Sequence, residues 1–134
     1  MNVLKPAVDR GDVKIVADQY AKEWQANEAL KIVENALTLV NNQVDAVVCS
    51  NDGTARGAVQ ALEGQGLAGK VLVSGQDADL PSMRLILEGK QTMTVYKSIQ
   101  PLANGAVDAA IVARERAYLL RRERGAEAAH PLGV

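Results

Sequence analysis

Four short runs of strand-forming residues, separated by helical patterns, constrain the fold of this 134-residue chain most strongly. The runs cover Val13–Ala17, Asp45–Cys49, Lys70–Ser74 and Thr92–Tyr96. The first three are nearly continuous apolar stretches, a pattern typical of strands buried on both faces. The fourth alternates polar and apolar residues, which suits the edge of a sheet. Because strands separated by helices require crossover connections, the sequence predicts an α/β fold with a doubly wound parallel sheet of about four strands.

Helical patterns fill the intervals between these runs. We expect four helices, over residues 28–40, 53–64, 80–89 and 98 to about 124. Asn27 is the expected N-cap of the first, and Pro81 is acceptable in the first turn of the third. Residues 1–10 have the pattern of the last turns of a helix, which Pro6 weakens. The final helix enters a stretch of mixed Arg and Glu residues that is typical of a solvated face.

The composition excludes several classes of function. A net charge of −1 and 3 % aromatic residues predict no nucleic-acid surface. The single cysteine, Cys49, cannot form an internal disulfide, and the single histidine, His130, argues against a histidine metal site or a Ser-His-Asp triad. No apolar run approaches the ~20 residues that cross a bilayer, and none near Met1 indicates a signal peptide. We expect no catalysis, cofactor, metal or membrane insertion.

Two apparent motifs have plainer interpretations. Gly64, Gly66 and Gly69 match the dinucleotide-binding fingerprint, which requires a strand before it and a helix after it. Here the order is reversed, so we interpret these glycines as the end of a helix and a turn. Cys49 ends an apolar run with no histidine near it in sequence, which favours a buried thiol over a nucleophile.

Polar and aromatic residues follow the predicted strands at the points where they end. Trp24 comes after the first run, Asn51 after the second, Asp77 after the third and Lys97 after the fourth. In an open parallel sheet, ligands bind beyond the carboxyl ends of the strands. An indole can pack on the C–H face of a sugar ring, while amide, carboxylate and ammonium groups hydrogen-bond its hydroxyls. This arrangement predicts a site for a small polar ligand such as a carbohydrate.

Each of these residues also has an ordinary structural role available. Asn51 or Asp52 could cap the following helix. Asp77 could cap or close a turn, Lys97 could be solvated, and Trp24 could pack a helix against the sheet. The placement of all four at successive strand ends favours the ligand site.

Three segments carry a resemblance to a known family: Asp45–Ala55 (DAVVCSNDGTA), Gly75–Asp79 (GQDAD) and Gln91–Lys97 (QTMTVYK). They resemble the C-terminal lobe of bacterial periplasmic sugar-binding proteins of ABC transporters, in particular the branch that binds D-xylose. The resemblance runs from Met1 to about Ala113. It implies a three-layer, flavodoxin-like lobe of a type I periplasmic binding protein, with the sugar in a cleft between two lobes. By motif, it implies that the binding residues of this lobe are Trp24, Asn51, Asp77 and Lys97.

The function implied by this resemblance is non-catalytic binding of a pentose, with D-xylose first, as the solute-binding component of an ABC importer. The implied partner is the transporter permease, and the implied location is periplasmic or extracellular. Two alternatives remain: the effector lobe of a sugar-responsive transcription regulator, and a small sugar-processing α/β enzyme. A helix-turn-helix would indicate the first alternative, and a phosphate-binding Gly loop or a base–nucleophile pair the second; the sequence has neither.

The length of the chain departs from the family pattern. We expect residues 1–113 to form part of a C-terminal lobe that lacks one lobe strand, and residues 114–134 to form a charged helical extension and a disordered tail. A one-lobe fragment is expected to bind sugar weakly or not at all. The missing strand leaves unpaired apolar edges, which predicts a homo-oligomer through the incomplete sheet. The alternative is closure of the gap by pairing of Val13–Ala17 with Asp45–Cys49.

Overall fold

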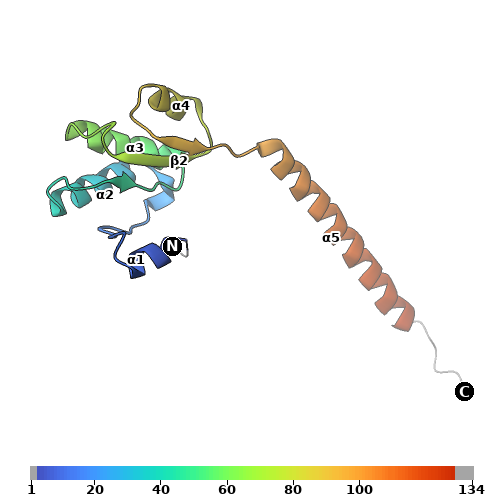
Figure 1. Cartoon of the computed structure of the whole chain (residues 1–134). Coiled ribbons are helices and arrows are strands. Elements are labelled where there is room, and N and C mark those ends of the chain that lie inside the picture. The colour runs from blue at the N-terminus through green and yellow to red at the C-terminus, as the bar shows by residue number, and fades with distance from the viewer. Residues whose placement is uncertain (1–2, 129–134) are drawn as a thin grey trace, which may run out of the picture. The chain divides into compact units, whose positions relative to one another are not determined.

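The computed structural model describes residues 3–128, which belong to two units with their boundary between Lys97 and Ser98. The first unit contains helices and strands in alternation (Figure 1). Its elements are α1 (Lys5–Asp9), the 3-10 helix η1 (Lys22–Trp24), α2 (Ala26–Leu39), β1 (Ala46–Val47), α3 (Asp52–Gly64), β2 (Leu72–Gln76), α4 (Leu80–Leu87) and β3 (Met93–Val95). The second unit is α5 (Ile99–Ala128).

The three strands form a parallel sheet in the order β1-β2-β3. Val47 pairs with Val73, and Gly75 pairs with Thr94. Each strand is joined to the next by a helix, so the predicted α/β class with crossover connections is confirmed. The prediction that residues 92–96 lie at a sheet edge is also confirmed, because β3 is the last strand of the sheet.

The strand predicted over Val13–Ala17 is wrong. These residues have no regular secondary structure, and Val13, Ile15 and Val16 are exposed. The backbone N–H of Val13 donates to the carbonyl of Ala7, a local bond that closes the turn after α1. A run of β-branched residues becomes a strand only when a neighbouring strand supplies backbone partners. Within the described residues, no strand pairs with this run, and it does not close the sheet against β1.

One face of the sheet carries the hydrophobic core of the first unit. Val73 and Gly75 of β2 are buried on this face, where α3 packs, and Leu85 of α4 contacts the same core. On the opposite face Leu72 is 58 % exposed, and Val48, just after β1, is 77 % exposed. The prediction that these strands are buried on both faces is therefore wrong for the first unit, since the second face of β2 is exposed at Leu72.

The helices α2 and α3 pack closely because small residues line their contact. Ala55, Ala58 and Ala61 of α3 are fully or almost fully buried. Gly57 lies directly against the backbone of α2 at the Ala26 carbonyl, where a Cβ would collide. Val33 and Leu37 of α2 and Val59 and Leu62 of α3 complete the core of the first unit.

The helix termini confirm most of the sequence predictions. Asp79 caps α4 by accepting from the backbone N–H of Ser82 (2.8 Å), and Pro81 lies in the first turn, as expected. Gly66 and Gly69 have positive φ in the turn between α3 and β2, which confirms that they end a helix. The predicted N-cap at Asn27 is wrong: η1 ends at Trp24, and α2 begins at Ala26 without a side-chain cap.

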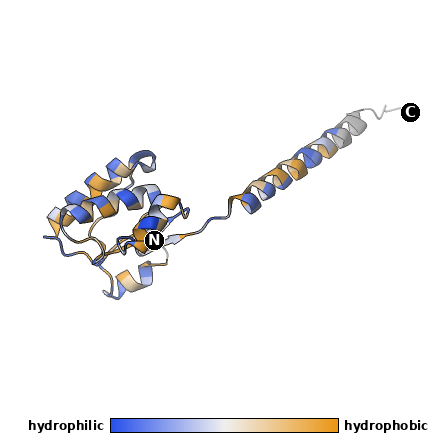
Figure 2. Ribbon diagram, turned by 90° about the horizontal axis from the view of Figure 1, so that it is seen from above, coloured by the Kyte–Doolittle hydropathy of each residue, from blue (hydrophilic) through white to orange (hydrophobic). Residues whose placement is uncertain are grey.

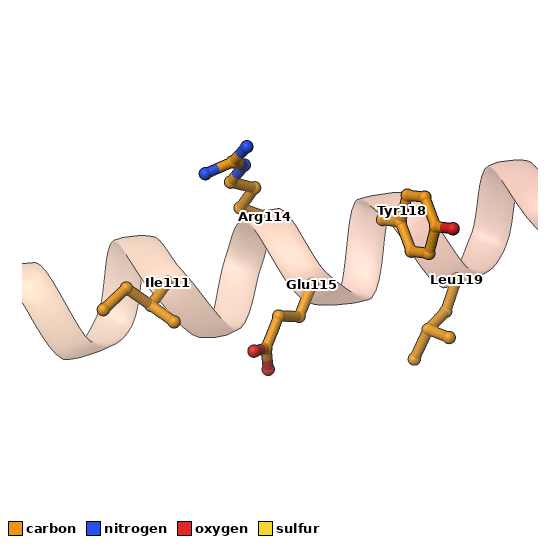
Figure 3. Close-up of a pocket in the computed structure, with 5 residues that line it drawn as sticks. All are labelled: Ile111, Arg114, Glu115, Tyr118 and Leu119. Atoms are coloured by element: carbon orange, nitrogen blue, oxygen red, sulfur yellow. The ribbon is translucent and has the colours of Figure 1, made fainter.

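Helix α5 confirms that the last helix continues through the Arg- and Glu-rich stretch. Hydrophobic and hydrophilic residues are intermixed along the coloured part of α5 (Figure 2), and side chains such as Ile111 and Tyr118 are exposed. A shallow surface depression on α5 is lined by side chains of this one helix only (Figure 3): Ile111, Arg114, Glu115, Tyr118 and Leu119. The predicted disordered tail, including His130, lies partly in α5 and otherwise outside the described residues. None of the described helices has the length and apolarity to cross a membrane.

Candidate functional site

The candidate site lies beyond the carboxyl ends of the three strands, where the chain leaves the sheet. Asn51 precedes α3 after β1, Asp77 directly follows β2, and Lys97 follows β3 by two residues. Trp24 ends η1, immediately before α2. The strands are parallel, so these turns share one edge of the sheet, which is where α/β proteins bind ligands.

Asp77 and Lys97 form an ion pair across the ends of β2 and β3. The Nζ of Lys97 lies 3.1 Å from Oδ1 of Asp77, and their side chains are 46 % and 40 % exposed. An exposed pair of this kind contributes only about 0–1 kcal/mol to stability. The helix cap that Asp77 could have supplied is supplied by Asp79 instead. Both charged groups are therefore available to hydrogen-bond an incoming hydroxyl.

Asn51 is the N-cap of α3. Its Oδ1 accepts hydrogen bonds from the backbone N–H of Thr54 (2.9 Å) and from the Thr54 hydroxyl (2.8 Å), and the Thr54 hydroxyl completes a capping box. The cap occupies the Asn51 oxygen, which is the structural role that the sequence also allowed for this residue. No described residue accepts from the Asn51 Nδ2, so the amide remains a donor.

Trp24 exposes 65 % of its surface, which excludes its alternative role of packing α2 against the sheet. Its φ is 52° and that of Glu23 is 51°, so two consecutive residues with side chains occupy the left-handed region. Non-glycine residues in this region are strained, and such strain gathers at functional sites. An exposed indole held this way presents a flat apolar surface to solvent.

The structure brings the four candidates together in two pairs. The first pair is Asp77 and Lys97, in direct contact. In the second, the backbone carbonyl oxygen of Trp24 and the Nδ2 of Asn51 would each lie 3.5 Å from a Cβ added at Gly53, so the Trp24 backbone and the Asn51 side chain flank the first turn of α3. The binding roles of the four residues stay a prediction.

Sequence reasoning missed the buried polar network beneath these residues. The fully buried carboxylate of Asp52 accepts from the backbone N–H of Asp79 (2.9 Å), the hydroxyl of Thr94 (2.7 Å) and the amide of Gln91 (3.3 Å). The weak signal for it was the alternation of residues 92–96, which places Thr94 on the opposite face from Met93 and Val95. The composition of the chain does not show that Asp52 is buried while the neighbouring Asn51 faces outward.

Asp79 links the network to α3 and α4. Its carboxylate pairs with Arg56 of α3 and caps α4 through the Ser82 backbone N–H. Partial burial opposes ionisation of this carboxyl, but the hydrogen bond from Ser82 and the Arg56 guanidinium outweigh it and hold the pKa of Asp79 below its ordinary value. Asp79 is therefore charged at neutral pH and keeps its cap.

The Cys49 thiol is partly buried, whereas the sequence predicted a buried thiol. Burial raises its pKa to about 11, against a smaller lowering effect of a hydrogen bond with Thr54. A thiol with this pKa is protonated at neutral pH, and the thiolate is the reactive form.

The parallel sheet and its helices define an α/β fold, and comparisons with known proteins identify its family. The periplasmic binding protein domain family matches residues 1–115. The chain belongs to this family. It is 60 % identical over 111 residues to the D-xylose-binding periplasmic protein of Escherichia coli (strain K12), a match that covers 83 % of this chain and 34 % of the relative.

A second curated relative and a solved structure agree with this assignment. The D-xylose-binding periplasmic protein of Haemophilus influenzae is 56 % identical over 83 % of this chain and 33 % of its own length. The chain thus spans about a third of these two relatives. The periplasmic solute-binding protein of an ABC transporter from Actinobacillus succinogenes, solved with bound D-allose, is 36 % identical, with a TM-score of 0.68, over 84 % of this chain and 40 % of that one.

Proposed function

We propose that the carboxyl edge of the sheet in residues 1–113 is one wall of a monosaccharide-binding cleft, with D-xylose as the preferred ligand. The lobe binds sugar without catalysis, in the periplasm, and the complete protein delivers it to the permease of an ABC importer. Residues 114–134 are an extension outside the lobe. The observation that carries the proposal is the exposed Asp77–Lys97 pair at this edge. The D-xylose-binding relatives support the choice of sugar.

Each of the four side chains has a distinct part in this proposal. Trp24 stacks on the C–H face of the sugar ring, which suits its exposed indole. The Asp77 carboxylate accepts from sugar hydroxyls in charge-assisted hydrogen bonds. Lys97 donates to a ring or hydroxyl oxygen and balances the carboxylate charge, and Asn51 donates through its free Nδ2. A ligand that binds here meets donors and an acceptor on one side and an aromatic face on another.

The single tryptophan of the chain provides a direct test. Its indole N–H gives one cross-peak in a nitrogen–proton correlation spectrum, and that peak reports on the proposed stacking residue itself. We expect the peak to shift progressively with D-xylose, more than with L-arabinose, D-ribose or D-glucose. A peak that none of these sugars moves would contradict the proposed function.

Removal of the carboxylate charge at the site is expected to weaken the binding of D-xylose. Asp77→Asn keeps the shape of the side chain but replaces one acceptor oxygen by a donor, so we expect roughly a tenfold loss of affinity, measured as the initial slope of the indole titration. Asp9→Asn is the matched control, because Asp9 forms a similarly exposed ion pair with Lys5 in α1 (2.8 Å). Equal slopes for Asp77→Asn and the unaltered chain would remove Asp77 from the site.

We also propose that copies of this chain associate through the free edge of β1. This strand pairs with β2 on one side, and within the described residues no strand lies along its other side. Exposed apolar side chains such as Val48 adjoin that edge. Unpaired strand edges pair readily with other chains.

Sedimentation at micromolar concentration tests the association. We expect species heavier than the 14.2 kDa monomer, and fewer of them for Val48→Lys, since a charge beside an edge strand opposes pairing. Leu39→Lys is the control, because Leu39 is as exposed as Val48 but lies on α2. A clean monomer with a cooperative melt would refute the association.

A further inference from the structure

The loop that carries Asp77 has a strained backbone. The φ of Asp77 is 112° and that of Ala78 is 56°, both in the region that residues with a Cβ rarely adopt. Such conformations persist only where the surroundings hold them in place. Three consecutive backbone N–H groups provide this hold: Asp77 donates to the Val95 carbonyl (2.9 Å), Ala78 to the Thr94 hydroxyl (3.2 Å) and Asp79 to the Asp52 carboxylate (2.9 Å).

Two of these three hydrogen bonds depend on Asp52. The Asp79 bond is made to its Oδ2 directly. The Ala78 bond depends on it indirectly, because a hydroxyl has one proton, and the Thr94 hydroxyl donates that proton to Oδ1 of Asp52. The lone pairs of the hydroxyl are then free to accept from Ala78. The carboxylate thus fixes the direction in which Thr94 accepts.

The same carboxylate connects the two pairs of candidate site residues. Asp52 directly follows Asn51 in the first turn of α3, and through Asp79 and Thr94 it holds the loop of Asp77. All three of its hydrogen-bond partners are donors, and its place in the first turn of α3 suits a side chain that accepts. Its full burial keeps water from competing for these bonds.

We propose that Asp52 is the positioning residue of the site. It touches no ligand, but it fixes the position of the Asp77 carboxylate, and thereby of the Asp77–Lys97 pair, relative to Asn51. The part of this proposal that concerns ligand affinity rests on the proposed function. The part that concerns the loop stands on the hydrogen bonds alone. Small displacements of a contacting group weaken binding strongly, so a residue of this kind controls affinity from beneath the surface.

Two nearly isosteric substitutions remove the hydrogen bonds that fix the Asp77 loop. In Asp52→Asn, the amide nitrogen faces a donor in whichever direction it points. Thr94→Val deletes the hydroxyl that accepts from Ala78, and Thr94→Ser restores that hydroxyl and is the rescue variant. Val33→Ala is the control for general destabilisation, because Val33 belongs to the core on α2 and contacts none of these polar groups by hydrogen bonds.

Two measurements on the full chain test the proposal. The first is the amide hydrogen-exchange rate of Ala78 and Asp79 relative to Val73 in β2. The second is the initial slope of the Trp24 indole titration with D-xylose. We expect Asp52→Asn and Thr94→Val to speed loop exchange and to reduce the slope, each by roughly tenfold. Thr94→Ser retains both values, and Val33→Ala lowers the melting temperature without a selective change in the loop.

The outcomes separate the two proposals. Unchanged loop exchange in Asp52→Asn, or a loss of slope in Val33→Ala as large as in Asp52→Asn, overturns the positioning role. If the unaltered chain shows no shift with any sugar, the proposed function fails, and the exchange rates still decide whether Asp52 holds the loop. Faster loop exchange with an unchanged slope shows that Asp52 holds the loop but overturns its control of binding.

Discussion

Gly57→Ala is expected to lower the free energy of unfolding by at least about 2 kcal/mol, the range of overpacked cores. A Cβ at this position overlaps the carbonyl of Ala26 and approaches the backbone N of Leu30 to 3.0 Å. Because the obstacle is backbone and not a flexible side chain, α2 has to move away from α3 as a unit. That movement opens the contact that buries Val33 and Leu37.

Urea denaturation followed by circular dichroism measures this loss. Gly64→Ala is the matched control, since Gly64 ends the same helix and a Cβ there meets nothing within 4 Å. The control should gain up to about 1 kcal/mol from the higher helix propensity of alanine. A Gly57→Ala variant that is as stable as the unaltered chain would mean that α2 and α3 pack less closely than the structure shows.

The fold was predictable from sequence where an element depends on its own residues. The alternation of residues 92–96 indicated an edge strand, and the pattern of residues 53–64 indicated the helix that the structure has as α3. The strand predicted over Val13–Ala17 is wrong because a strand forms only against a neighbouring strand. The composition of the run does not show whether that neighbouring strand is present. The predicted burial of both faces of β2 is wrong for the same reason. Leu72 is exposed, because burial of its face requires packing partners that the described residues of the first unit do not supply.

The sequence was sufficient to predict that the candidate site lies at the carboxyl edge of the sheet. It was not sufficient to predict the hydrogen-bonding role of each side chain there. The rule for strand ends in parallel sheets selected Asp77 and Lys97, which the structure places in contact. It could not show that the Asn51 oxygen serves the helix cap, or that the neighbouring Asp52 points inward. Those assignments depend on which of two adjacent polar side chains faces the core, and both fit the sequence equally well.

The affinity of this 134-residue chain for D-xylose is expected to be at least about a thousandfold lower than that of the D-xylose-binding periplasmic protein of Escherichia coli, a difference of roughly 4 kcal/mol. High-affinity sites bury most of the ligand surface and exclude water. Here Trp24, Asp77 and Lys97 are all substantially exposed, so a sugar bound at this edge keeps the hydroxyls of its far side in water. Each charged group also stays solvated, which weakens its hydrogen bonds to the ligand. Calorimetric titration of both proteins in one buffer measures the difference. Micromolar or tighter binding by the monomer of this chain would show that these residues alone enclose the sugar.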